Sequence, residues 1–211
     1  MNTTIISNTG AVALLPWGRS IMVLMHGTML LGLMLITGHV SALEFKQVNA
    51  NESSITFGYK QMNVPLEGKF NKFDAQVSFD PAKATKAQAR IDINVASIDT
   101  GSAEANEEVV GKLWFNAKTF PTASFASTGI KDLGGNRYQA FGKLSIKGKT
   151  LDVSTPVTFH TNGTRGIFEG SFNIKRLDYA IGEGEWTDVS AVADEIQIKF
   201  HLVVNAAPSK K

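Results

Sequence analysis

Apolar and polar residues alternate one by one along most of this chain after its first forty residues. The clearest case is Glu195–Val204, where the apolar residues occupy even positions from Ile196 to Val204. The segment from Tyr138 to Ile146 repeats the pattern. Because successive side chains of a strand point to opposite faces, this spacing predicts half-buried β-strands. Turn residues separate them, and "GGN" and "KGKT" are typical of hairpin turns.

One segment breaks the alternation. Gly101–Lys118 contains "SAEANEEVVGKLWF", whose Ala and Glu residues favour a short helix followed by a loop. The sequence therefore predicts an all-β, antiparallel, eight-stranded barrel with a short helical insertion. A sandwich would also suit such strands, but Gly142 and Gly170 on apolar faces favour a barrel.

An eight-stranded barrel is just wide enough to be filled by side chains or to hold one slim ligand. Small residues on the inward faces would leave a channel open: Ala75, Ala140, Gly142 and Gly170. Alternatively, large neighbours on adjacent strands fill the gaps. The pattern alone leaves both possibilities open.

The N-terminal part of the chain, residues 1–42, has the features of a secretory signal peptide. Arg19 precedes an apolar core, Ile21–Thr37, without Asp, Glu, Lys or Arg, and Val40 and Ala42 are spaced as at a cleavage site. The alternative is an uncleaved membrane anchor. We expect cleavage near Ala42 and a single domain from residue 43 to 211, which predicts a periplasmic protein.

Composition excludes several functions. The chain of 211 residues contains no Cys, which excludes disulfides and thiolate metal sites. Its formal net charge of +2 gives no electrostatic footprint for nucleic acid. Beyond residue 42 the only histidines are His160 and His201, without a third ligand at metal-site spacing. No hydrolase, zinc-protease or phosphate-loop motif is present, so the sequence predicts neither an enzyme nor a metal site.

Several stretches, in this order, resemble the YceI-like family of polyisoprenoid-binding bacterial proteins. They are "LEGKFNKFDAQVSFDP", "ASIDTGSAEAN", "LWFNAKTFPTASF", "YQAFGKLSIKGKT" and "IKRLDYAIGEGEW". The resemblance implies a secreted, lipocalin-like barrel that holds an isoprenoid, a quinone-type lipid or a similar long-chain lipid, and no other cofactor. The "GEGEW" form looks like members found beside membrane-bound b561-type cytochromes, which implies a quinone-related role and such a cytochrome as a partner.

The chain departs from the family in the helical insertion. Where many members carry Arg-Asp followed by His, this chain has Ala105, Asn106 and Glu108. A different head-group environment would follow if that cluster contacts the ligand. The insertion or an open edge strand could also support a homodimer.

The candidate ligand-binding residues are the large residues of the inward faces, the aromatics of the insertion and the charges that follow Ile174. Arg176 could hold a phosphate or a quinone carbonyl, or it could form a structural ion pair with Asp178, Glu183 or Glu185. An accessory protein with a filled barrel and a small enzyme acting on a lipid head group remain as alternatives. The predicted ligand-binding set is Phe57, Phe73, Phe79, Trp114, Phe115, Tyr138, Leu144, Phe172, Arg176, Asp178, Ile198 and Phe200.

Overall fold

The computed structural model describes residues 43–207, so the predicted signal peptide lies outside the described part of the chain. Eleven strands belong to one antiparallel sheet in the order β4-β5-β7-β8-β9-β10-β11-β2-β3-β6, with β1 paired to β11. The strands are β1 Phe45–Val48, β2 Ser54–Gln61, β3 Val64–Phe70, β4 Phe73–Ser78, β5 Gln88–Asn94, β6 Ile98–Asp99, β7 Thr122–Gly134, β8 Arg137–Ile146, β9 Lys149–Asn162, β10 Arg165–Lys175 and β11 Glu195–Ala206.

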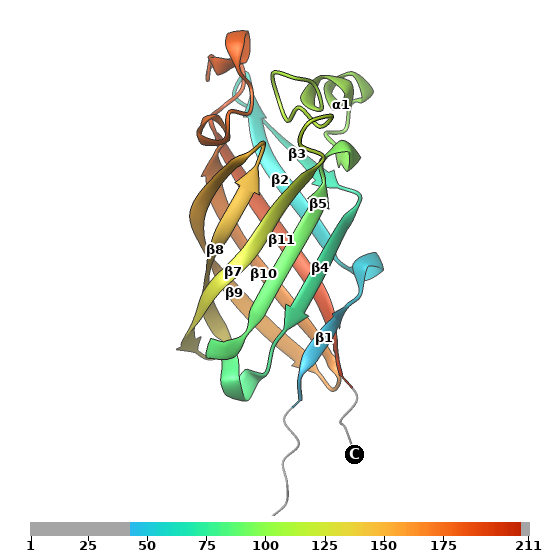
Figure 1. The fold of residues 1–211 in the computed structure, drawn as a ribbon, viewed down its shortest axis with the longest axis vertical. Coiled ribbons are helices and arrows are strands. Elements are labelled where there is room, and N and C mark those ends of the chain that lie inside the picture. The colour runs from blue at the N-terminus through green and yellow to red at the C-terminus, as the bar shows by residue number, and fades with distance from the viewer. Residues whose placement is uncertain (1–42, 208–211) are drawn as a thin grey trace, which may run out of the picture. The chain divides into compact units, whose positions relative to one another are not determined.

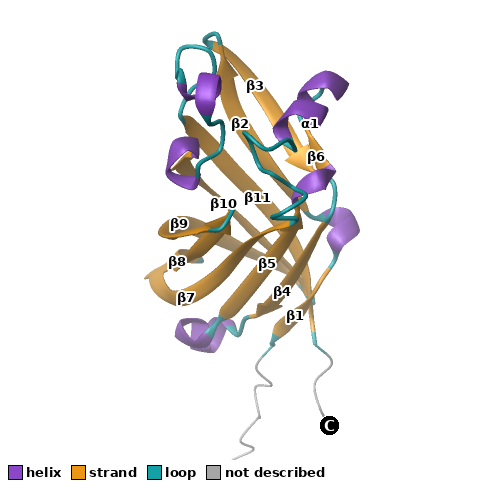
Figure 2. Cartoon of the chain, turned by 45° about the horizontal axis from the view of Figure 1, so that its top comes forward, coloured by secondary structure: helices purple, strands orange, loops and turns teal. Residues whose placement is uncertain are grey.

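The predicted fold class is confirmed: the sheet is antiparallel and curled (Figure 2), with one short α-helix in the described residues, α1 Ala103–Val109, in the insertion. The count of eight strands was three too low. The short strands β1 and β6 have only four and two residues, and β3 contains Pro65 and Gly68 and is largely exposed, so none of the three has a clear buried face in the sequence. Short 3-10 turns complete the fold: η1 Ala50–Glu52, η2 Pro81–Lys86, η3 Val95–Ser97, η4 Arg176–Tyr179 and η5 Gly184–Thr187. None of the helices described in residues 43–207 is long and apolar enough to span a membrane.

Two short strands connect distant parts of the curled sheet. Phe45 of β1 exchanges backbone hydrogen bonds with Phe79, just after β4, at 2.8 and 3.1 Å, while β1 also pairs with β11. On the other side β6, which follows β5 through η3, pairs with β3. The curled sheet therefore encloses an interior, and the predicted turns at 134–137 and 147–149 join β7 to β8 and β8 to β9.

The interior has two buried clusters, one toward each end of the sheet. We call the end that carries α1 and the β10–β11 connection the helix end, and the opposite end, with β1, the β1 end (Figure 1). At the β1 end the buried residues are mainly aromatic, and Phe79 lies 4.6 Å from Phe159 and 5.0 Å from Phe168 between ring centroids. At the helix end the cluster includes Trp114 and Tyr179.

Candidate functional site: the barrel lumen

Two adjoining cavities occupy the interior. The large cavity, of about 480 Å³, lies toward the helix end and is lined by residues of α1, the β10–β11 connection and the neighbouring strands. The small cavity, of about 120 Å³, lies toward the β1 end. They share five lining residues: Ile55, Ile93, Leu144, Phe172 and Ile198. The larger volume is within the range of about 300–1,000 Å³ typical of small-molecule sites.

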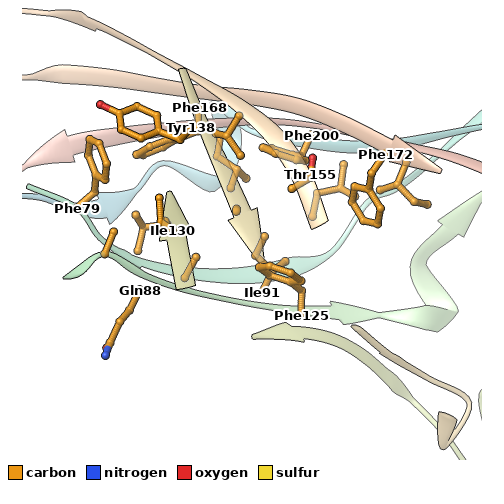
Figure 3. A pocket seen from close by; sticks show the side chains of 18 of the residues that line it. Phe79, Gln88, Ile91, Phe125, Ile130, Tyr138, Thr155, Phe168, Phe172 and Phe200 are labelled. Carbon is orange, nitrogen blue, oxygen red and sulfur yellow. The ribbon is translucent and has the colours of Figure 1, made fainter. Parts of the chain in front are cut away.

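The small cavity presents an apolar wall. Figure 3 shows Phe125, Phe172 and Phe200 around it, while the side chain of Gln88 extends away from the other lining residues. The buried Thr155 hydroxyl lies 3.1 Å and 3.4 Å from the carbonyl oxygens of Pro156 and Ser171 and can donate to either. Nothing in this cavity is therefore suited to hold a charged group.

Glycines in the walls let phenylalanine rings lie against the neighbouring strand. A Cβ at Gly170 would come within 2.4 Å of the Phe200 ring, and one at Gly142 within 2.3 Å of the Phe125 ring. A Cβ at Gly68 would likewise come within 2.3 Å of the Phe57 ring. Of the two possibilities that the pattern left open, the second holds at these glycines, because large neighbours cover them, while the interior remains open elsewhere.

Arg176 sits at the helix end with 1% of its surface exposed. Its guanidinium donates from Nε to the Ala193 carbonyl at 3.1 Å and from Nη1 to those of Ile181 and Gly182 at 2.9 and 3.3 Å. Nη2 donates to the carbonyls of Trp186 and Val192 at 2.6 and 2.7 Å.

The predicted structural ion pair between Arg176 and one of the nearby carboxylates is therefore wrong. Within residues 43–207 Arg176 forms no salt bridge, and backbone carbonyls take the place of Asp178, Glu183 and Glu185. Burial lowers the pKa of Arg176, and the nearby Asp194 carboxylate opposes that effect. An arginine remains charged under such conditions, so Arg176 fastens the β10–β11 connection as a buried cation.

Two tryptophans pack beside Arg176. Trp114 and Trp186 line the large cavity with their ring centroids 5.2 Å apart, and the Arg176 Cζ lies 5.5 Å from the centroid of Trp114. Both indole nitrogens are buried without a hydrogen-bond partner in the described residues. The two indole N–H groups are thus donors without a protein acceptor in that part of the chain, at the wall of the large cavity.

Most of the predicted ligand-binding residues line the lumen. The small cavity includes Phe79, Tyr138 and Phe200, the large cavity includes Phe57, Trp114, Phe115 and Arg176, and both include Leu144, Phe172 and Ile198. Ligand contact by these residues stays a prediction.

Phe73 and Asp178 line neither cavity. Phe73 packs half-buried beside the aromatic cluster of the β1 end. Asp178 is exposed because β10 ends at Lys175 and the chain then enters η4, so the strand alternation no longer applies there. The prediction that both residues belong to the lumen is thus not supported by their positions.

Sequence reasoning missed several lining residues. Ile55 and Ile93 were on predicted inward faces and could have been included on that signal. Glu104 and Glu108 follow the i, i+4 spacing of one helix face, which is detectable in the sequence. Trp186 lies in an irregular connection, and no periodic pattern marks it.

The described residues contain no candidate metal centre. No group of three or more His, Asp or Glu side chains in residues 43–207 is arranged to hold a metal ion. The two histidines lie apart on β9 and β11, and His201 Nδ1 is 2.9 Å from Glu169 Oε1 at the surface.

Comparison with known proteins agrees with this architecture. The chain is 52% identical to Burkholderia cenocepacia BcnA, whose crystal structure superposes with a TM-score of 0.73 over 74% of this chain and 99% of that one. A UPF0312 protein of Yersinia pestis (strain Pestoides F) is 31% identical over 180 residues, 82% of this chain and 91% of its own.

A more distant structure shares the fold. A polyisoprenoid binding domain from Saccharophagus degradans, implicated in plant cell wall breakdown, is 18% identical, with a TM-score of 0.61 over 78% of this chain and 99% of that one. The model of the YceI-like domain matches residues 47–204. This chain therefore belongs to the YceI-like family.

Proposed function

We propose that this protein binds an isoprenoid or a similar long-chain lipid in its lumen and carries it through the periplasm. The observation that carries the proposal is the pair of adjoining cavities with predominantly apolar walls. Each methylene group removed from water contributes about 0.8 kcal/mol, so an enclosed apolar lumen can hold a chain that water would reject. Membership of the YceI-like family and the described ligand of the Saccharophagus relative support the same function.

The open interior also favours ligand binding over the alternative of a filled barrel that docks on a partner. A large cavity of about 480 Å³ is more than packing defects usually leave in a protein interior. Docking on a b561-type cytochrome, dimer formation and periplasmic location remain predictions. Lipid binding needs no bond-breaking step, so the proposal assigns no catalytic residue.

Native mass spectrometry of the protein purified from its own host, followed by organic extraction, tests the proposal. We expect a co-purifying lipid with a long apolar chain, released on extraction. A ligand-free mass, together with failure to take up added polyprenyl lipids, would contradict the proposal and favour docking.

A substitution in the lumen provides a second test. Phe172 lines both cavities, and Phe172→Trp should narrow the passage between them and weaken lipid binding by about tenfold or more. Phe141 on β8 is 43% exposed, so Phe141→Trp serves as a matched control that should not alter affinity. Unchanged affinity in a folded Phe172→Trp variant would argue against a ligand at this position.

A further inference from the structure

We infer that the large cavity selects a long-chain lipid whose head group carries no negative charge, such as an alcohol or a quinone, over one that ends in a phosphate. This inference rests on the proposed lipid binding and narrows its ligand class. Three charged residues line the large cavity: Glu104, Glu108 and Arg176. Their arrangement decides which charge a head group can carry.

Arg176 has no donor left for a ligand. A guanidinium has five N–H groups, and Arg176 uses its donors on the five carbonyl oxygens described above. Its position over the Trp114 ring adds the negative face of an aromatic system to these carbonyl dipoles. A phosphate could form the usual forked contact with this guanidinium only by displacing backbone partners.

Lys147, at the same end, also uses its ammonium group on protein partners. The Lys147 side chain is 6% exposed and lies 2.8 Å from the Glu183 carboxylate. It also donates to the carbonyl oxygen of Ala180 at 2.6 Å. The two buried cations of the helix end, Arg176 and Lys147, are thus engaged in holding the chain that surrounds the cavity.

The remaining charges at the cavity are negative. Glu104 and Glu108 are one turn apart on α1, and they line the large cavity together with Ala105 and Val109 from the same helix face. No Lys or Arg in residues 43–207 forms a salt bridge with either carboxylate. Both carboxylates are exposed at the cavity wall, so their repulsion of an anion is strongest at low salt. An approaching phosphate would meet like charge without a free cation among the described lining residues, because the unpaired indole N–H groups of Trp114 and Trp186 are neutral donors that also suit an uncharged head group.

The test compares two probes of equal chain length, a polyprenol and its monophosphate, with the purified protein after lipid extraction. We expect the polyprenol to bind more tightly by on the order of tenfold at low salt. Glu104→Gln with Glu108→Gln should reduce this ratio toward one, and Lys at both positions should reverse it.

Glu107 provides the matched control. It is on the same helix but does not line the cavity, so Glu107→Gln should leave the ratio unchanged. Equal or tighter binding of the phosphate by the unmodified protein would overturn the inference while lipid binding stands. Binding of neither probe would instead contradict the proposed function.

Discussion

The two ends of the sheet are closed by different physical means. At the β1 end, phenylalanine rings on strands or directly beside them pack edge to face, and the adjoining cavity is about 120 Å³. At the helix end, an irregular connection is tied to Arg176 by hydrogen bonds, and the adjoining cavity is about 480 Å³. Apolar packing fills space efficiently, whereas a network anchored on one cation can fix a loop and leave room beside it. One end is therefore stable through dense apolar packing, and the other through a buried cation that holds its loop around an open cavity.

Replacing Arg176 should have the largest effect on stability. Arg176→Met leaves five carbonyl oxygens without their donor, and each unpaired buried group costs about 1–3 kcal/mol. We expect the free energy of unfolding to fall by about 5 kcal/mol in urea titrations. Arg176→Lys, which keeps the charge and three donors, should lose less. A loss under 1 kcal/mol for Arg176→Met would show that the helix end does not depend on this cation.

Truncating the aromatic cluster should be the next largest effect. Phe79→Ala removes a ring that is 2% exposed and contacts several other rings, so we expect a loss of about 3–4 kcal/mol. Phe115→Ala, at a half-buried ring of the helix end, should cost less than half as much. If calorimetry gave equal losses of unfolding free energy for Phe79→Ala and Phe115→Ala, the distinction between a packed end and an open end would not hold.

Tyr179 should make the helix end sensitive to alkaline pH. Burial, with a smaller effect from Asp178, raises the pKa of Tyr179 from 10.0 to about 12. The folded state therefore holds the phenolic proton more tightly than the unfolded state does. The associated stability is complete below pH 10 and is lost as pH rises through about 12, by about 2–3 kcal/mol in total.

Tyr179→Phe should remove the part of the alkaline loss of unfolding free energy that comes from this phenol. Urea titrations between pH 9 and about 12 would measure the difference. Tyr138→Phe at the β1 end is the comparison, because burial also raises the pKa of Tyr138, though by less than for Tyr179. An alkaline profile that Tyr179→Phe leaves unaltered would contradict the assignment.

A methyl group at Gly170 should produce the smallest of these effects. The new Cβ would meet the Phe200 ring and the Pro156 carbonyl oxygen, both at 2.4 Å, so both the ring and the backbone of the neighbouring strand must shift. We expect a loss of about 2 kcal/mol. Gly129→Ala, with no atom within 4 Å of its Cβ, should change stability by less than about 0.5 kcal/mol. Similar values for the two variants would mean that the wall tolerates a side chain at Gly170.

The strands and their inward faces were predictable because both follow from local alternation, whereas the alternation left undecided whether the interior is open or filled. Tyr138, Leu144 and Ile198 were assigned to inward faces from their spacing alone, and they line the cavities. The helix of the insertion was evident from its composition. A shift of the strand pairing by one residue would turn the whole apolar face to solvent, so a half-buried strand needs a strict alternation that can be recognised in the sequence.

The sequence by itself determined the fold class, the hairpin turns and the inward-facing residues of this protein, since each depends on neighbours along the chain. The tertiary structure alone decided the partners of Arg176, because they are carbonyl groups that every residue carries and no side-chain pattern marks. It also decided that Asp178 turns outward and that Glu104 and Glu108 reach the cavity, since these positions depend on where a strand ends and a helix docks. Long-range placement of backbone has no periodic signature in sequence.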